Sequence, residues 1–121
     1  MYTKKEIGNI GEDVAVEYLE NMNYKIIQRN FSSRYGEIDI IAKDIKSNEI
    51  VFIEVKTRTN NNYGKPVDAI NYQKVKHIYK TAQYYIKQNK LEQKYIRFDA
   101  IEVYLSEILK KARVHHIYNM I

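Results

Sequence analysis

Two acids and one lysine in the first half of the chain have types and spacing suited to phosphate chemistry. Asp39 lies in the apolar segment 37–42, and Glu54 and Lys56 lie two residues apart in the segment 49–56. If both segments are strands, side chains two residues apart project from the same face. Carboxylates are ligands that Mg²⁺ and Mn²⁺ prefer, and an ammonium group can orient a water nucleophile and stabilise phosphate charge. The pattern predicts metal-assisted phosphodiester hydrolysis.

The pairing expected between these two strands places the acids together. A hairpin symmetric about residues 46 and 47 pairs residue i with residue 93 − i, so that Asp39 faces Glu54. Two carboxylates about 5 Å apart, at an effective dielectric near 20, repel by roughly 3 kcal/mol. We therefore expect Mg²⁺ or Mn²⁺ between them, with the Val55 carbonyl as a further candidate ligand. A register shifted by one residue would separate the acids, and Glu-Val-Lys is also common at solvated strand edges.

A third acid, Glu12, lies in a segment whose apolar residues recur at helical spacing. On a helical wheel it borders the apolar stripe, about 20° from Leu19. The nearby Gly8 and Gly11 each cost roughly 1 kcal/mol in helix propensity, and glycines allow another backbone to approach closely. Two interpretations stay open for Glu12: an exposed acid near the start of a helix, or a third member of the metal site.

Periodicity and turn signals predict the elements that position these groups. A capping box at residues 3–6 begins a helix over residues 3–22, and Asn71 is the expected N-cap of a second helix that ends near residue 89. Strands are expected at residues 24–31, 37–42, 49–56, 97–104 and 113–118, with a turn at 32–36 and a loop at 57–66.

This order of elements predicts an α/β fold with a mixed sheet flanked by two helices. The first three strands would form an antiparallel meander, and the fourth would join it after a helical crossover. The 121 residues and 14.5 kDa fit one domain, residues 1–121, with a single core.

Composition excludes several kinds of protein. Cys is absent, which removes disulfide scaffolds, thiolate metal sites and cysteine nucleophiles. The first residues carry no apolar signal segment, and no apolar run approaches the roughly 20 residues of a membrane span. We expect a cytoplasmic protein without a membrane partner.

Positive charge gathers in the second half of the chain. Residues 1–60 hold 9 basic and 10 acidic side chains, whereas residues 61–121 hold 11 basic and 5 acidic ones, and the net charge is +5. This asymmetry favours a polyanionic partner such as DNA, although lysine-rich usage also follows genome composition. The candidate nucleic-acid contacts are Arg58, Lys76, Lys80 and Lys87. The three lysines are expected on the outer face of the second helix, together with His77 and Tyr84. A solvated lysine face is the alternative.

Six ordered motifs resemble those of the YraN family of bacterial proteins. They span about residues 8 to 103: Gly8-x-x-Gly11-Glu12, Arg29-Asn30-Phe31, the run from Gly36 to Ala42, the run from Val51 to Arg58, Gly64-x-Pro66 and Arg97-Phe98-Asp99. Members of this family are similar to restriction-endonuclease-like, PD-(D/E)xK nucleases, in particular to archaeal Holliday-junction resolvases.

The resemblance implies a fold, a site and a partner. It implies a restriction-endonuclease-like core in which Glu12, Asp39 and Glu54 support metal binding and Lys56 assists catalysis. Gln73 and Lys74 match positions at which some relatives place a supporting polar residue. The resolvase likeness also implies a homodimer, because a symmetric junction needs two cuts.

The expected function is therefore a divalent-metal-dependent endonuclease acting on structured or branched DNA. Two alternatives stay open: a nucleic-acid-binding module that keeps the constellation without turnover, and an accessory protein without salt-dependent nucleic-acid affinity. His115 and His116, as neighbours on a strand, are expected to face opposite sides and not to share a metal.

Overall fold

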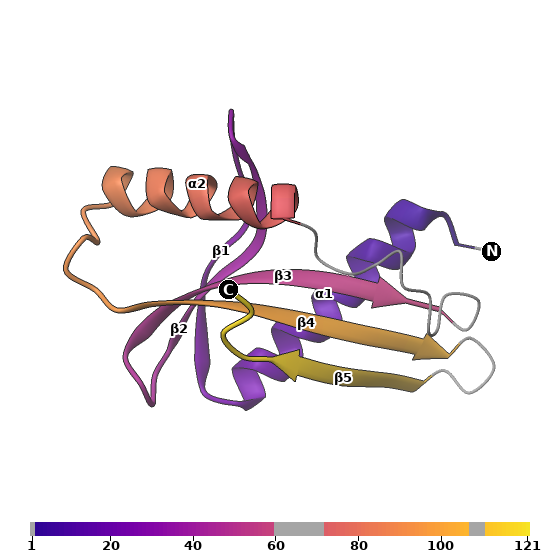
Figure 1. The fold of residues 1–121 in the computed structure, drawn as a ribbon. Coiled ribbons are helices and arrows are strands. Elements are labelled where there is room, and N and C mark those ends of the chain that lie inside the picture. Colours follow the sequence, from indigo (N-terminus) through magenta and orange to yellow (C-terminus); the bar gives the residue numbers. More distant parts are fainter. Residues whose placement is uncertain (1, 60–71, 107–110) are drawn as a thin grey trace.

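The computed structural model, which describes residues 2–59, 72–106 and 111–121, contains a five-stranded mixed sheet with a helix on each face (Figure 1). The strands lie in the order β1-β2-β3-β4-β5. The elements are α1 (Lys4–Asn21), β1 (Tyr24–Ser33), β2 (Gly36–Asp44), β3 (Glu49–Arg58), α2 (Tyr72–Gln88), β4 (Ile96–Ser106) and β5 (Lys111–Ile117).

The sheet topology confirms the predicted mixed α/β class. β1, β2 and β3 form an antiparallel meander, β4 pairs with β3 in parallel, and β5 returns antiparallel to β4. A parallel neighbour requires a long crossover connection, which contains α2. Neither described helix is long and apolar enough to cross a bilayer.

The predicted element boundaries hold at the first helix and change elsewhere. The capping box is confirmed: Thr3 Oγ1 accepts from the Glu6 N–H at 3.1 Å, and Glu6 Oε1 accepts from the Thr3 N–H at 3.0 Å. The predicted turn at 32–36 is too long, because β1 continues to Ser33 and β2 begins at Gly36, whose φ of 145° suits glycine.

The predicted loop at 57–66 is also wrong at its start. Thr57 and Arg58 belong to β3, where they pair in parallel with Val103 and Tyr104 of β4. Polar residues in this segment suggested a loop, but the partner strand supplies backbone hydrogen bonds regardless of side-chain polarity. The rest of that loop and the expected N-cap Asn71 lie outside the described residues.

Alternate residues of the central strands pack against different helices. Val51 and Ile53 of β3 join the core cluster that contains Ala15 and Leu19 of α1, whereas Phe52 joins the cluster that contains Ala82 and Tyr85 of α2. The two helices therefore cover opposite faces of the sheet, with burial of both apolar layers holding them in place.

The regular alternation breaks on β2 at Asp39. Ile38 belongs to the α2 cluster, but Ile40 belongs to the α1 cluster, although the two residues are only two positions apart. Asn30 of the neighbouring strand has φ 53° at this point, and the β1–β2 hairpin bends away from the sheet and passes α2 (Figure 1). The alternation of faces along β2 therefore breaks beside Asp39, which lies at a bend.

A buried ionic network ties the far end of the sheet together. The Arg97 guanidinium donates to Asp99, Asp44, Glu49 and the hydroxyl of Tyr24, at distances of 2.6 to 3.1 Å. Asp99 is fully buried. A charge removed from water is tolerated when it is paired and hydrogen-bonded, as it is here.

The two adjacent histidines face opposite sides, as predicted. His116 Nε2 lies 2.7 Å from Asp99 Oδ2 and His116 Nδ1 lies 2.9 Å from the Tyr18 hydroxyl, within the α1 side. His115 Nδ1 instead lies 2.9 Å from Glu102 Oε1 near the opposite surface. His116 thus extends the Arg97 network to α1.

One glycine lets α1 approach the sheet closely. A Cβ atom at Gly11 would overlap the side chain of Thr57 on β3, whereas a Cβ at Gly8 would meet no atom of the described residues within 4 Å. The expected close approach is therefore confirmed for Gly11 alone. It brings the first half of α1, including the adjacent Glu12, against β3.

Replacing Gly11 by alanine should destabilise the protein, although alanine favours helices. Overpacking against Thr57 typically costs about 1–3 kcal/mol, which exceeds the roughly 1 kcal/mol gained in helix propensity. Gly8→Ala is the matched control, and it should be neutral or stabilising. Urea unfolding of both variants checks this, and equal free energies of unfolding would contradict the close contact.

Acid should weaken the fold through Asp99. Burial opposes ionisation of Asp99, but hydrogen bonds from His116 and Arg97 hold its pKa below the ordinary value. The pKa of Asp99 is lower in the folded protein than in the unfolded chain, where it is about 4. The stabilisation is therefore fully present above the unfolded-state pKa and is lost as pH falls through the folded-state pKa.

Asp99→Asn should cost about 3–5 kcal/mol at pH 7, since it leaves Arg97 incompletely paired. It should also flatten the acid dependence of the free energy of unfolding. Asp13→Asn removes only an exposed partner of Arg29 and should cost less than about 1 kcal/mol. Parallel acid profiles for wild type and Asp99→Asn would refute this account.

Candidate functional site

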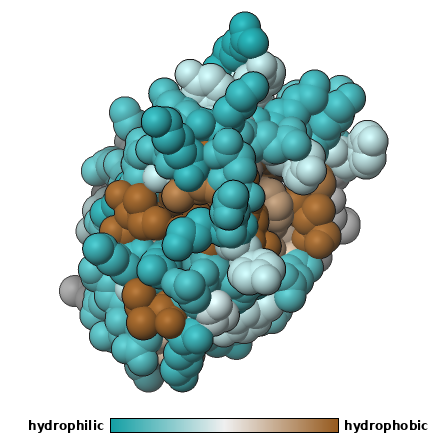
Figure 2. Space-filling view, turned by 90° about the vertical axis from the view of Figure 1, so that its left-hand side faces the viewer, coloured by the Kyte–Doolittle hydropathy of each residue, from teal (hydrophilic) through white to brown (hydrophobic). Residues whose placement is uncertain are grey.

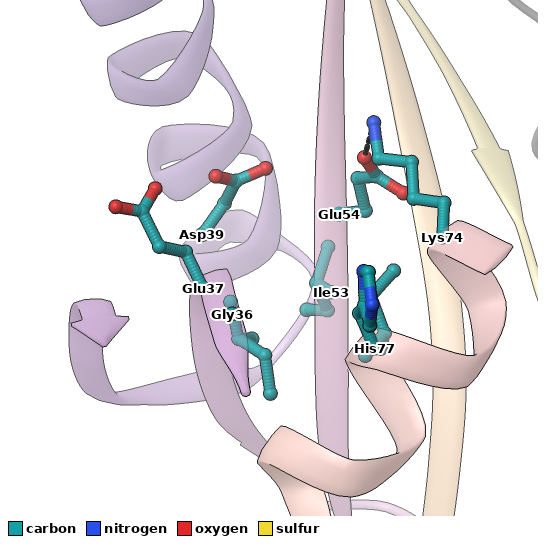
Figure 3. A pocket seen from close by; sticks show the side chains of 9 residues that line it. Gly36, Glu37, Asp39, Ile53, Glu54, Lys74 and His77 are labelled. Atoms are coloured by element: carbon teal, nitrogen blue, oxygen red, sulfur yellow. Dashed lines mark ion pairs between the residues drawn. The ribbon is translucent and has the colours of Figure 1, made fainter. Parts of the chain in front are cut away.

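A pocket of about 310 Å³ lies between the bent part of β2, β3 and the first turns of α2 (Figure 3). Its charged and titratable lining comes from three elements: Glu37 and Asp39 from β2, Glu54 from β3, and Lys74 and His77 from α2. Convergent polar groups in a concave site are the usual signature of a functional centre.

The predicted register brings the two acids to this pocket. β2 and β3 pair from Asp44↔Glu49 to Ile40↔Ile53, as the symmetric hairpin requires. The backbone ladder ends there. One position further, the Val55 N–H donates to Asp39 Oδ2 at 2.8 Å, so the Asp39 carboxylate is fastened to the β3 backbone next to Glu54.

The environment of Asp39 disfavours its negative charge. Burial raises the pKa of Asp39 to about 6, and the neighbouring charges of Glu54 and Glu12 add to this increase. The hydrogen bond from Val55 and the positive charge of Lys74 act in the opposite direction. The acids are therefore close enough to repel, and a cation beside them would relieve the repulsion.

Glu54 is buried and only half satisfied. Its Oε1 pairs with the ammonium group of Lys74, and Lys56 Nζ lies 3.6 Å from the same oxygen. Its Oε2 is buried and has no hydrogen-bond partner among the described residues. A buried carboxylate oxygen without a partner is costly, which makes this atom a candidate ligand for a cation.

Glu12 is held at the back of the site by the edge strand. Its side chain is nearly buried, and Oε1 accepts from Arg29 Nε at 2.9 Å and from Asn30 Nδ2 at 3.2 Å. Arg29 also pairs with Asp13. Glu12 therefore acts on Asp39 through its charge, and its orientation is set by two residues of one predicted motif.

The donor set fits a hard divalent cation coordinated mainly by two carboxylates. Within the described ranges, no three His, Cys, Asp or Glu side chains gather closely enough to bind one ion. Asp39 and the unpartnered Glu54 Oε2 nevertheless offer oxygen ligands from two adjacent strands. Mg²⁺ commonly takes one or two protein carboxylates and keeps several waters, which matches this pair.

The remaining predicted residues lie at varied distances from the pocket. Lys74 lines it, whereas Gln73 is exposed and does not. Arg58 is largely buried and pairs with Glu102 at 2.7 Å, so its guanidinium is held against β4. Lys76, Lys80 and Lys87 are exposed on α2.

Two α2 residues expected on the outer face are exposed, as predicted, but both also lie beside other elements. His77 lines the pocket, and Tyr84 packs on Phe31 and Tyr35 of the bent hairpin at ring-centroid distances of 6.3 and 6.2 Å. The bend of β1 and β2 past α2 covers this flank of the helix. The sequence offered one signal for His77: it lies one helical turn after Lys74, so the two residues share a face of α2. This spacing assigns His77 to the pocket only when Lys74 is already known to line it.

A second groove, between the end of α2 and the start of β4, is larger but chemically poorer. Its volume is about 650 Å³, and Tyr79, Ile86, Ile96 and Phe98 supply much of its lining. Figure 2 views this end of the molecule, where apolar patches are separated by hydrophilic surface. The groove lacks the pair of facing acids found at the first pocket, which remains the candidate site.

Comparison with known proteins places the chain in a family. Residues 11–103 match the family described as "Uncharacterised protein family UPF0102". A UPF0102 protein of Clostridium botulinum (strain Hall) is 50% identical over 119 residues, covering 98% of this chain and 95% of that protein. A UPF0102 protein of Caldanaerobacter subterraneus subsp. tengcongensis is 47% identical over 117 residues, covering 96% and 94%. The chain therefore belongs to the UPF0102 family, the YraN family indicated by the sequence motifs.

Proposed function

We propose that this protein is a divalent-metal-dependent endonuclease that hydrolyses phosphodiester bonds in structured DNA. The observation that carries the proposal is that Asp39 and the half-satisfied carboxylate of Glu54 line one pocket, with the ammonium groups of Lys74 and Lys56 beside Glu54. The element order and the motifs resemble the restriction-endonuclease-like core, and this likeness supports the same activity.

Asp39 and Glu54 would hold the metal ion, with the Val55 carbonyl as a further ligand. A bound Mg²⁺ or Mn²⁺ would stabilise charge on the phosphate and lower the pKa of a water molecule. A cation bound there would lower the pKa of Asp39, which burial raises. The Asp39 hydrogen bond to β3 keeps the two acids at a fixed separation.

Lys56 and Lys74 have different roles in this proposal. Lys56, beside Glu54 Oε1, would align the attacking water and offset charge on the phosphate. Lys74 is bound to Glu54 and fixes the orientation of that carboxylate. Glu12, held by Arg29 and Asn30, adds negative charge near Asp39, which favours a cation there, without reaching the pocket lining.

The substrate is inferred from charge and from resemblance. The net charge of +5 and the exposed lysines of α2 suit a polyanion. The likeness to Holliday-junction resolvases favours branched DNA and a homodimer that makes two symmetric cuts.

A nucleic-acid-binding module without turnover is the second candidate. One observation favours it: Lys74 already neutralises part of the Glu54 charge, so the site is partly compensated without a metal. Such a module would bind DNA with strong salt dependence but would not cut it.

Metal binding should be visible as stabilisation of the fold. Mn²⁺ at 100 times its dissociation constant contributes about 2.7 kcal/mol and should raise Tm by several degrees. Glu54→Gln should abolish most of this increase, whereas Glu20→Gln, an exposed change on α1, should keep it. An equal Mn²⁺ effect in wild type and Glu54→Gln would place the ion elsewhere.

Cleavage of branched, flapped and single-stranded DNA with Mg²⁺ or Mn²⁺ tests the activity. Asp39→Asn and Lys56→Ala should slow cutting by about 10²-fold or more, because each removes a group that acts on the phosphate or the water. Asp13→Asn and Lys25→Ala are matched exposed controls.

Unchanged cutting in both site variants would refute the site assignment. Tight, salt-dependent binding without cutting of any substrate would favour the binding module. An absence of salt-dependent affinity for all three substrates would leave the accessory role.

A further inference from the structure

We infer that His77 is the proton donor to the leaving oxygen in this reaction. The inference rests on the proposed function and adds a catalytic residue to it. Asp39, Glu54 and Lys56 account for the ion and the attacking water, but none of them supplies the proton that the departing alkoxide needs.

The fold fixes His77 at the pocket. It lies one helical turn after Lys74, and Figure 3 shows both side chains on the α2 side of the pocket that Asp39 and Glu54 also line. The start of β2 approaches the stem of His77 closely: a Cβ atom at Gly36 would lie 3.6 Å from the His77 Cβ. The start of β2 therefore lies beside His77, at the edge of the pocket that its side chain lines.

The imidazole of His77 is not committed to a structural role. Its residue is exposed, and in the described part of the chain its ring makes no hydrogen bond or ion pair, although its backbone carbonyl accepts from Thr81 Oγ1 at 2.7 Å. His115 and His116, by contrast, are both paired with acids. The charged groups that share the pocket with His77 are Glu37 and Asp39 from β2, Glu54 from β3 and Lys74 from its own helix.

The chemical step balances with His77 in this role. A water oxygen forms a bond to phosphorus while the bond from phosphorus to the leaving oxygen breaks, and the electron pair stays on that oxygen. The leaving oxygen takes the proton of the His77 imidazolium, the water releases one proton to solvent, and solvent reprotonates the imidazole. Histidine is the side chain that most often serves as a general acid, because its imidazole can both give up and regain a proton. Lys74 suits it less, because it is bound to Glu54.

Sulfur substitution of the leaving oxygen tests this role directly. A thiolate, with a pKa near about 8.5, departs without a proton, whereas an alkoxide does not. The cut position is first mapped with the wild-type protein and Mn²⁺, and two DNA substrates are then made with oxygen or sulfur as the leaving atom. Single-turnover rates are measured for wild type, His77→Gln and His115→Gln, the last being an exposed histidine outside the pocket.

His77→Gln should cut the oxygen substrate about 10²-fold more slowly and should cut the sulfur substrate at close to the wild-type rate. His115→Gln should match wild type on both. Retained Mn²⁺ stabilisation of His77→Gln shows that the variant is folded and that the acids are in place.

An equal loss on both substrates, or no loss on either, would overturn the role of His77 while leaving the proposed nuclease intact. A wild-type protein that cuts neither substrate would overturn the nuclease and this inference together.

Discussion

The site depends on one hydrogen bond, between the Val55 N–H and the carboxylate of Asp39. β2 bends out of the sheet at Asp39, where Ile38 and Ile40 pack on opposite faces, so the backbone ladder with β3 ends. The carboxylate of Asp39 takes the place of the missing backbone acceptor at 2.8 Å. This contact fastens one acid beside another. Burial and the neighbouring acids raise the pKa of Asp39 to about 6, although the hydrogen bond itself acts in the opposite direction.

The two ends of the sheet treat buried charge in opposite ways. Around Arg97 the acids are fully paired, and the pKa values of Asp44 and Asp99 are lowered although burial alone would raise them. At the pocket, Glu54 keeps a buried oxygen without a described partner, and Asp39 carries an unfavourable charge. The Arg97 network, in which every acid is paired, stabilises the fold. The acids Asp39 and Glu54, in contrast, would be stabilised by a further positive charge. Acids with unfavourable charges are typical of functional sites, and such a site needs a stable fold to hold its residues in position.

Local sequence rules predicted the parts of this arrangement that depend on counting residues. The short β2–β3 connection fixed the register from Ile40↔Ile53 onward, and Gly11 indicated a close approach that Thr57 provides. These rules failed where a segment far away in the sequence determines the local structure. Thr57 and Arg58 are strand residues because β4 lies beside them, and His77 faces the pocket because the bent hairpin passes that flank of α2. A helical wheel places residues relative to one another but does not say what lies opposite them.

The central claim is that Asp39 and Glu54 together hold a divalent cation. Anomalous scattering from a crystal soaked in Mn²⁺ tests it most directly, since it locates the ion without assuming a substrate. The account predicts a peak within about 2–2.3 Å of a carboxylate oxygen from each of the two residues. A crystal in which Mn²⁺ binds only elsewhere, or in which Asp39 and Glu54 point to different sides of the sheet, would contradict it.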